Sequence, residues 1–187
     1  MAGCMQAAKV VAWDEQVALN SGETIEVHRE QTYESRGQPG NPLKPGWISK
    51  RWGTARLTWR EREYVFNEHS APMLLAISPE GLPVFLIDPG IGAWSDLNNH
   101  PCSTPYYVQF VPDASGRRWT RLNTPEPWLY GLRTNLLMEL PRPGSAATRY
   151  TAADVRRIHE SVNLRPENQI VDPTYTPDHC KGKRTAS

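Results

Sequence analysis

The most hydrophobic stretch of the chain, residues 73–88, is interrupted by a short turn sequence. Its two apolar arms flank Ser78-Pro79-Glu80-Gly81 in the sequence MLLAISPEGLPVFLID. Pro79 fixes φ near the value that the second position of a type I turn requires, and Gly81 can adopt the left-handed conformation that closes a three-residue loop. We therefore predict an antiparallel hairpin whose facing pairs are Ser78 with Leu82, Ala76 with Val84 and Leu74 with Leu86.

Neither arm of this hairpin alternates apolar with polar residues. Residues 74–77 and 84–87 are hydrophobic on both sides, whereas a strand with one solvated face would alternate. The arms are too short for buried helices, and the prolines and the glycine break any helical pattern. Pro83 has no N–H to donate, so it must occupy a non-bonded position of the ladder or a bulge. The hairpin is therefore predicted to be covered on both faces.

A second hairpin is predicted around Gly22, with arms at 11–19 and 23–33. A three-residue loop ending at Gly22 pairs Val17 with Ile25, whereas a slip of one residue would place a glutamate opposite Val17. The same register pairs Leu19 with Glu23, Glu15 with Val27, and Trp13 with Arg29, the last as a cation–π pair.

The remainder of the chain predicts short strands and one helix. Strands are expected at 54–60, 61–66, 106–111, 118–122 and 133–140. Residues 34–53 contain many prolines and glycines and are expected to form an irregular surface loop with a short strand around Ile48. Thr151 and Asp154 form a capping pair that begins a helix at 151–163, with Val155, Ile158 and Val162 as its apolar stripe.

We therefore predict a mainly β fold, in which antiparallel hairpins form a sandwich or curled sheet, with one C-terminal helix. The expected organisation is an N-terminal segment 1–8, a β domain 9–140, a linker 141–150, the helix 151–164 and a largely irregular tail 165–187, disordered near its end.

Composition excludes few classes of function. The 187 residues carry 21 basic and 20 acidic side chains, for a net charge of +1. This balance gives no overall argument for binding nucleic acid or an anionic membrane. No run approaches the roughly 20 apolar residues of a membrane span. No glycine-rich phosphate loop is present, and no cofactor is predicted.

The first residues resemble the end of a lipoprotein signal. Ala-Gly precedes Cys4, as in the cleavage box after which the cysteine is lipidated. The charged and apolar parts of such a signal are absent from the sequence. The alternatives are a chain that starts just inside a lost signal, with Cys4 lipidated, and a loose terminus.

A basic and aromatic stretch at residues 50–62 suggests a possible surface for single-stranded nucleic acid, because bases stack on aromatic rings while basic groups follow the backbone. It contains Lys50, Arg51, Trp52, Arg56, Trp59, Arg60 and Arg62. The alternative is a solvated strand face opposite a buried tryptophan face, and one patch on a neutral protein favours that alternative.

The pattern of hydrophobic and turn residues over about 13–138 resembles a family of uncharacterised proteobacterial proteins, many of them lipoprotein-like. The residues that carry it are Trp13-Asp14-Glu15, Val17, Leu19, Gly22, Ile25, Val27, Arg29, the 74–77 run before a Pro-Val strand, Pro105-Tyr106-Tyr107, Trp119 and Asn135-Leu136-Leu137. The resemblance implies a cell-envelope location and no particular activity. The helix and tail lie outside it.

Three cysteines leave alternatives open. With Cys4 lipidated, Cys102 and Cys180 would form a disulfide in an oxidising periplasm. A zinc site of His100, Cys102, His179 and Cys180 has suitable ligand types, but its spacings do not match the usual gaps and adjacent residues rarely reach one ion. A Cys102 nucleophile with His100 as base lacks an orienting third group.

Other candidate chemistry is weaker still. His159-Glu160 resembles half of a metalloprotease motif, but the second helical histidine is missing. Asp14 and Glu15 are neighbours in a strand, so they point to opposite faces and cannot form a pair of catalytic acids.

The best-supported expectation is a non-catalytic cell-envelope domain that binds a protein or an envelope component. Its possible binding surface is formed by Trp52, Arg56, Trp59, Arg60, Trp94 and Trp128, with Trp47 also in an exposed loop. It would be periplasmic and lipid-anchored if a signal is missing from this chain, and cytoplasmic otherwise. The alternatives are a thiol- or zinc-dependent hydrolase built on the His100–Cys102 loop and a single-stranded nucleic-acid binder.

Overall fold

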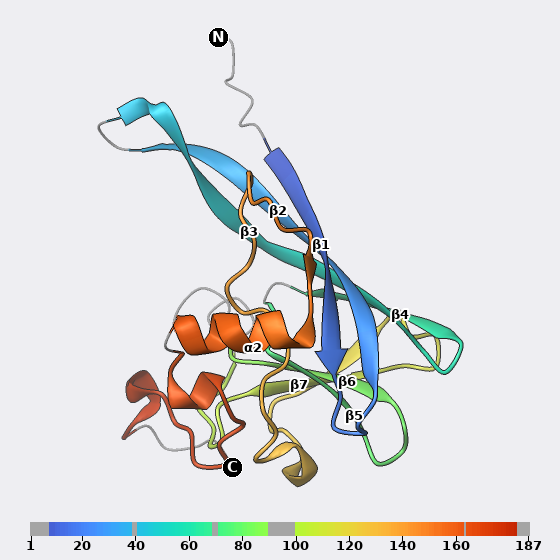
Figure 1. Ribbon diagram of the computed structural model, residues 1–187. Coiled ribbons are helices and arrows are strands. Elements are labelled where there is room, and N and C mark those ends of the chain that lie inside the picture. Colours follow the sequence, from blue (N-terminus) through green and yellow to red (C-terminus); the bar gives the residue numbers. More distant parts are fainter. Residues whose placement is uncertain (1–7, 39–40, 69–70, 90–99, 163, 183–187) are drawn as a thin grey trace.

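Two β-sheets form the body of the molecule in the computed structural model, which describes residues 8–38, 41–68, 71–89, 100–162 and 164–182. The first sheet has the order β4-β3-β2-β1-β9, and the second has the order β5-β6-β7-β8 (Figure 1). The strands of the first are β1 (Ala8–Ala18), β2 (Thr24–Gln38), β3 (Asn41–Trp59), β4 (Arg62–Glu68) and β9 (Arg149–Tyr150); those of the second are β5 (Leu74–Ile77), β6 (Pro83–Ile87), β7 (Val108–Pro112) and β8 (Trp119–Leu122).

The two hairpins predicted from turn chemistry form in the predicted registers. In β1–β2, Val17 faces Ile25 and Trp13 faces Arg29, whose guanidinium carbon lies 5.1 Å from the centre of the tryptophan ring. In β5–β6, Ala76 faces Val84. These pairings confirm the two predicted hairpins and, with them, the prediction of a mainly β fold.

The β5–β6 hairpin is buried on both faces, as predicted: every residue of both strands is buried. Its backbone also accommodates Pro83, because the neighbouring Ser78 N–H donates to the Leu82 carbonyl at 2.8 Å and leaves the Ile77–Pro83 pair as a non-bonded position.

One face of the second sheet packs on the first sheet, so the fold is a sandwich. Phe66 of β4 forms the centre of this core, with ring centres 4.5 Å from Phe85 and 5.2 Å from Phe110. The aromatic rings meet in tilted and edge-on arrangements, which are the favourable geometries for aromatic pairs.

The opposite face of the second sheet is covered by irregular chain. The segment that contains η1 (Pro127–Leu129) and the tail that contains η2 (Pro166–Asn168) and η3 (Asp178–Cys180) provide this cover. Leu129 and Val171 are completely buried against Leu74 and Leu86. The described part of the tail, residues 164–182, has little regular structure and is packed as far as Cys180. The predicted disorder near the end of the chain concerns residues outside the described ranges.

Residues 133–140 do not form the predicted strand. They form irregular chain, with one isolated bridge between Arg133 and Ile170. Asn135 and Leu136 both donate their backbone N–H groups to the Met73 carbonyl, and Leu137 donates to the Glu15 carboxylate. The apolar pattern correctly indicates that Leu136 and Leu137 are buried. The predicted strand pairing is wrong, because the backbone N–H groups of this segment donate to residues far away in the sequence.

Residues 34–38 and 41–53 also differ from the prediction, since they continue β2 and β3 as a long two-stranded arm. Ser35 faces Trp47 and Glu34 faces Ile48, and the arm projects from the body of the molecule (Figure 1). β4 begins to pair only at Gly53. Before that point β3 has a single neighbour among the described strands, and prolines are tolerated on such an open side.

The helix α2 (Ala152–Ser161) begins as predicted. The Thr151 side chain accepts from the Asp154 N–H, and the Asp154 carboxylate accepts from the Thr151 N–H. Val155 packs with Trp13 and Leu137, which places the helix against β1. Just before it, within the predicted linker, β9 pairs with β1 in parallel. No helix in the described ranges is both long and apolar enough to span a membrane.

Two asparagine side chains close the outer edge of β5. Asn135 accepts from the Leu75 N–H at 2.9 Å and donates to the Leu75 carbonyl at 2.8 Å. Asn20 repeats this pattern at Ile77, with distances of 2.7 and 2.9 Å. Asn135 also donates to the Ala18 carbonyl, which connects the two sheets. A carboxamide is suited to this role because it carries a donor and an acceptor side by side.

We expect the substitution Asn135→Asp to lower the free energy of unfolding by about 2 kcal/mol, because a carboxylate keeps the shape but leaves the Leu75 and Ala18 carbonyls without a donor. Denaturant unfolding measures the change. Asn67→Asp, on an exposed residue of β4, is the matched control and should change stability by less than about 0.5 kcal/mol. Equal effects of the two substitutions would contradict the bridging role.

Candidate functional site

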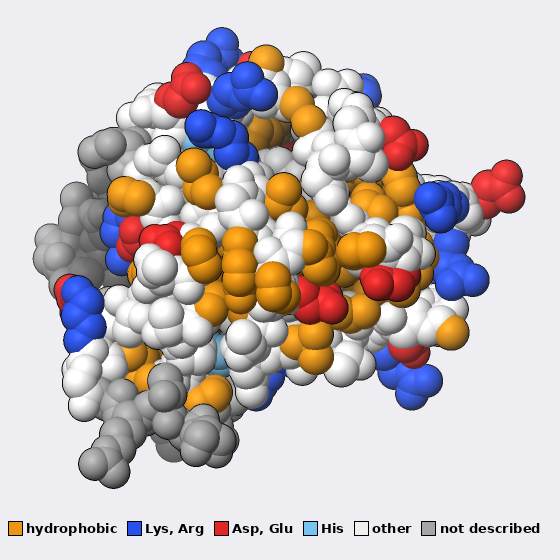
Figure 2. Space-filling model, turned by 90° about the horizontal axis from the view of Figure 1, so that it is seen from below, with side chains coloured by type: hydrophobic (Ala, Val, Ile, Leu, Met, Phe, Trp, Pro, Cys, Tyr) orange, Lys and Arg blue, Asp and Glu red, His pale blue; other side chains and the backbone are white. Residues whose placement is uncertain are grey.

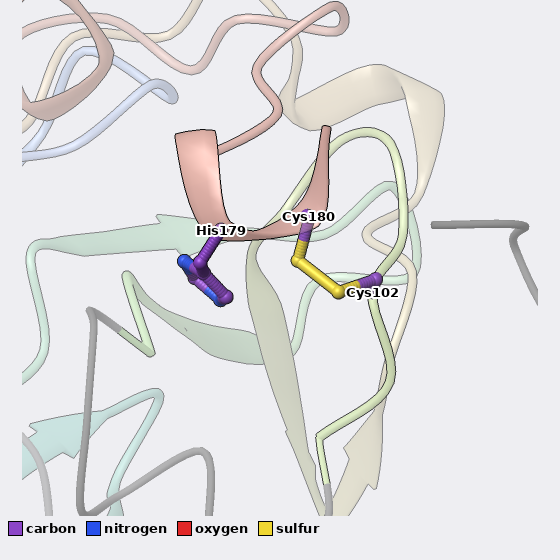
Figure 3. A group of neighbouring side chains, drawn as sticks. All are labelled: Cys102, His179 and Cys180. Carbon is purple, nitrogen blue, oxygen red and sulfur yellow. A yellow bond between two sulfur atoms is a disulfide. The ribbon is translucent and has the colours of Figure 1, made fainter. Parts of the chain in front are cut away.

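The predicted disulfide between Cys102 and Cys180 is present in the structure. It joins the segment before β7 to η3, across 78 residues of sequence, with a Cα–Cα distance of 5.4 Å (Figure 3). Cys180 is buried. The bond therefore fastens the C-terminal tail to the loop that leads into the second sheet.

Three of the four predicted zinc ligands meet at this disulfide. Possible ligand atoms of Cys102, His179 and Cys180 lie within 4.8 Å of one another. His179 comes from the same short helix as Cys180 and lies beside the sulfur atoms (Figure 3). Both sulfurs are used in the disulfide, however, and zinc binds thiolates. The oxidised cluster also lacks the free thiol that a Cys102 nucleophile would need.

His100 is not part of that cluster and instead packs against Tyr106, with ring centres 4.8 Å apart. Burial, together with the positive charge of Arg121, lowers the pKa of His100 to about 4. The imidazole is therefore neutral at pH 7 and serves as a packed aromatic ring.

In the part of the basic and aromatic stretch whose side chains the structure describes, residues 53–62, the aromatic and basic side chains lie on opposite faces of β3. Arg56 and Arg60 are exposed, but Trp59 is buried in the core, so its inclusion in a binding surface is wrong. Its indole N–H donates to the Gly81 carbonyl at 2.9 Å, and the Arg60 guanidinium covers its ring. The solvated strand face with a buried tryptophan face is the arrangement found.

Other predicted surface residues are placed unevenly. Trp128 is half-buried, and its indole N–H donates to Glu126 at 3.1 Å. It belongs to η1. On the face of the molecule seen from below, hydrophobic side chains form a band between polar and charged ones (Figure 2). Cys4, Trp94 and the Trp52 side chain lie outside the part of the chain that the structure describes.

The adjacent acids Asp14 and Glu15 point to opposite faces, as predicted. Asp14 pairs with His28 on the outer face, whereas Glu15 is fully buried and accepts from Arg29 at 2.8 Å, from the Trp13 indole at 2.5 Å and from the Leu137 N–H at 2.9 Å. Glu15 therefore has a complete set of structural partners.

A groove beside α2 is a concave site in which several charged and polar side chains of the described residues meet. It holds about 170 Å³ and lies between one side of α2, the end of β1 and residues 133–135. Its lining includes Arg133, Asn135, Arg156, His159, Glu160 and Gln169. The tail supplies Gln169, so the groove combines segments that are far apart in the sequence.

Three charged groups in this groove have no ion-pair partner among the described residues. Arg133, Arg156 and Glu160 are all exposed, and none forms a salt bridge there, although Arg156 and Glu160 are four residues apart on the helix. By contrast, Arg157 pairs with Asp154 on the same helix. The groove thus presents two guanidinium groups and one carboxylate that the fold does not use.

His159 supplies a buried polar group at the same place. Its residue is 8 % exposed, and its Nε2 has no hydrogen-bond partner within the described ranges. Burial lowers the pKa of His159, while hydrogen bonding to the Leu136 backbone and the negative charge of Glu15 oppose the shift. The Leu136 backbone raises the pKa, so it acts as an acceptor toward the imidazole. We therefore assign the acceptor role in the neutral ring to Nε2, the nitrogen that has no partner.

Sequence reasoning did not identify this groove. His159 follows Val155 by one helical turn, so its position on the buried face could be read from the sequence. Arg133 was assigned to a strand that does not form, and its approach to the helix depends on contacts over long sequence separations.

The neutral state of His100 predicts a pH dependence of stability. Its folded pKa lies below its unfolded value of 6.5, so the unfolded chain binds more protons as the pH falls. Stability is therefore full above pH 6.5 and declines between about 6.5 and 4, by up to about 3 kcal/mol. Urea unfolding of His100→Gln across this range should give a flatter profile than the unmodified chain; parallel profiles would contradict the assignment.

Comparisons with protein-family models, with curated proteins and with solved structures found no match. The resemblance to proteobacterial lipoprotein-like proteins stays a prediction, and function is argued from the geometry of the chain itself.

Proposed function

We propose that this chain is a non-catalytic binding domain of the cell envelope, which works in an oxidising compartment and takes up its ligand in the groove beside α2. The observation that carries the proposal is the Cys102–Cys180 disulfide. Such bonds persist in exported proteins and are rare where the cytosol keeps thiols reduced. Lipid on Cys4 would then tether the domain to a membrane, as the opening Ala-Gly-Cys indicates.

Binding is favoured over catalysis by the partners of the candidate catalytic groups. Cys102 is in the disulfide, and Glu15 has its full set of hydrogen bonds in the core. The His100 ring packs edge-on against Tyr106. The two arginines and the histidine of the groove are among the groups that have no internal partner in the described residues, and such groups can recognise a ligand by charge and hydrogen bonding.

The disulfide also supports the groove. The tail between α2 and η3 contributes Gln169 to the lining and Val171 to the buried face of the second sheet. Cys180 holds the far end of that tail. A domain that needs this bond to keep its binding surface in shape is suited to a compartment that maintains disulfides.

The compartment is tested by expressing the gene with its natural upstream region in its own host and trapping thiols in intact cells with a maleimide of known mass. We expect Cys102 and Cys180 to be protected until a reductant is added, and the protein to fractionate with the envelope. Free thiols at both positions in a soluble cytoplasmic protein would refute the proposal.

The double substitution Cys102→Ser/Cys180→Ser should lower the free energy of unfolding by about 4 kcal/mol, because a loop of 78 residues regains its freedom in the unfolded chain. Denaturant unfolding with and without reductant measures this loss. Cys4→Ser is the matched control and should leave stability unchanged. A double variant as stable as the oxidised parent would show that the bond does not hold the tail.

A further inference from the structure

We propose that the groove beside α2 binds an α-carboxylate with an N–H group next to it, as found in a free amino acid and in the C-terminal residue of a peptide. This inference rests on the proposed binding function and names the chemistry of its ligand. It follows from the kinds of polar group that the fold leaves available, their arrangement around one small space, and the size of that space.

The anionic end of the ligand is selected by Arg133 and Arg156. Both line the groove from different segments, and neither has a carboxylate partner among the described residues. A guanidinium donates two parallel N–H groups, which match the two oxygens of a carboxylate. Because both arginines are exposed and form no ion pair among the described residues, a ligand gains these contacts without first breaking an internal ion pair.

The neighbouring N–H is selected by acceptors. Nε2 of His159 is buried and lacks a partner within the described ranges, and a buried acceptor of this kind favours a ligand that brings a donor. Glu160 adds a second acceptor on the next residue of the helix. A simple anion would pair with the two arginines but would leave Nε2 of His159 without a hydrogen-bond donor.

Other polar side chains of the groove are already used by the protein. The Thr134 hydroxyl donates to the Asn168 carbonyl at 3.0 Å, and the Gln169 amide donates to the Leu164 carbonyl at 2.5 Å. Asn135 is bonded to Leu75 and Ala18. The available set is therefore Arg133 from the irregular segment, and Arg156 with the two acceptors His159 and Glu160 from α2. A carboxylate beside an N–H complements these groups.

The size of the groove limits the ligand further. About 170 Å³ is less than the roughly 300–1,000 Å³ of pockets that enclose drug-sized molecules. It can hold the polar end of one residue, while anything longer must continue into solvent. This fits both a small free amino acid and a peptide that inserts only its last residue.

The test is calorimetric titration of the full, oxidised chain with four small probes. N-acetylalanine represents a peptide end, alanine a free amino acid, acetate a carboxylate alone, and alaninamide a donor without the carboxylate. We expect N-acetylalanine or alanine to bind at least ten-fold more tightly than acetate and alaninamide, and the tighter of the two identifies the source. Equal binding of acetate, or no binding of any probe, would overturn the inference.

Matched arginine substitutions locate the site. Arg133→Gln/Arg156→Gln should reduce the affinity for the preferred probe at least ten-fold, whereas Arg157→Gln, which removes the arginine paired with Asp154, should leave it unchanged. All three positions are exposed, so the variants are expected to fold, and thermal unfolding checks this. Equal losses from the double variant and from Arg157→Gln would place the binding elsewhere and overturn the proposal.

The outcome for the histidine separates recognition of the N–H from recognition of charge. His159→Phe should bring the affinities for N-acetylalanine and acetate within three-fold of each other, because only the first probe loses a contact. An unchanged ratio in a folded variant overturns the role of Nε2. These results are independent of the thiol trapping above: an oxidised envelope protein that binds none of the probes refutes the ligand class only, and a reduced cytoplasmic protein refutes the location only.

Discussion

The structure depends on a sheet that is apolar on both faces. The strands β5, β6 and β7 cannot be stable with either face in water, since each large buried side chain such as Leu74 or Phe85 contributes about 1.5–3 kcal/mol by leaving it. Two covers are therefore required. The first sheet supplies one through Phe66 and its neighbours, and the tail with the η1 segment supplies the other through Leu129 and Val171.

The second cover explains why a tail with little regular structure is ordered. Irregular chain gains few internal hydrogen bonds, so its position is fixed by what it packs on and by its attachments. Tyr107, just before β7, donates its hydroxyl to the Glu167 carbonyl, and the Tyr106 N–H donates to the Tyr175 carbonyl. The disulfide at Cys180 adds a covalent attachment beyond these contacts. Gln169 reaches the groove beside α2 because the tail is fixed on both sides of it.

Glu15 performs a comparable task at the junction of the first sheet with the helix. It connects β1 to β2 through Arg29 and to residue 137 through a backbone N–H, directly beneath the residues on which α2 packs. Buried ion pairs add little net stability, but loss of one partner leaves an uncompensated charge. The pair therefore favours one arrangement of these segments over others, and it places His159 close to a fixed negative charge.

The sequence predicted those parts of the fold whose cause is local. Gly22 and Gly81 determine two hairpin registers, and Thr151 with Asp154 determines the start of the helix. The extended β2–β3 arm is not predicted, because its prolines and glycines are typical of a loop. Its two strands are stabilised by their pairing with each other. The segment at Asn135 was assigned to a strand because its residues are buried, yet its partners are the edge of β5 and the carboxylate of Glu15. The groove could not be predicted for the same reason: it requires knowing which distant segments meet beside α2.

The side chains that occupy strand edges affect how this protein behaves at high concentration. Exposed edges recruit strands from other molecules and begin fibrous assemblies. Here Asn20 and Asn135 occupy the edge of β5, and on β4 the Val65 N–H and carbonyl are taken by the Gly116 carbonyl and the Trp119 indole. A neighbouring copy would have to displace these groups before it could pair there. The protein can therefore have long strands and an apolar core, and still resist edge-to-edge strand pairing between molecules at the β4 and β5 edges.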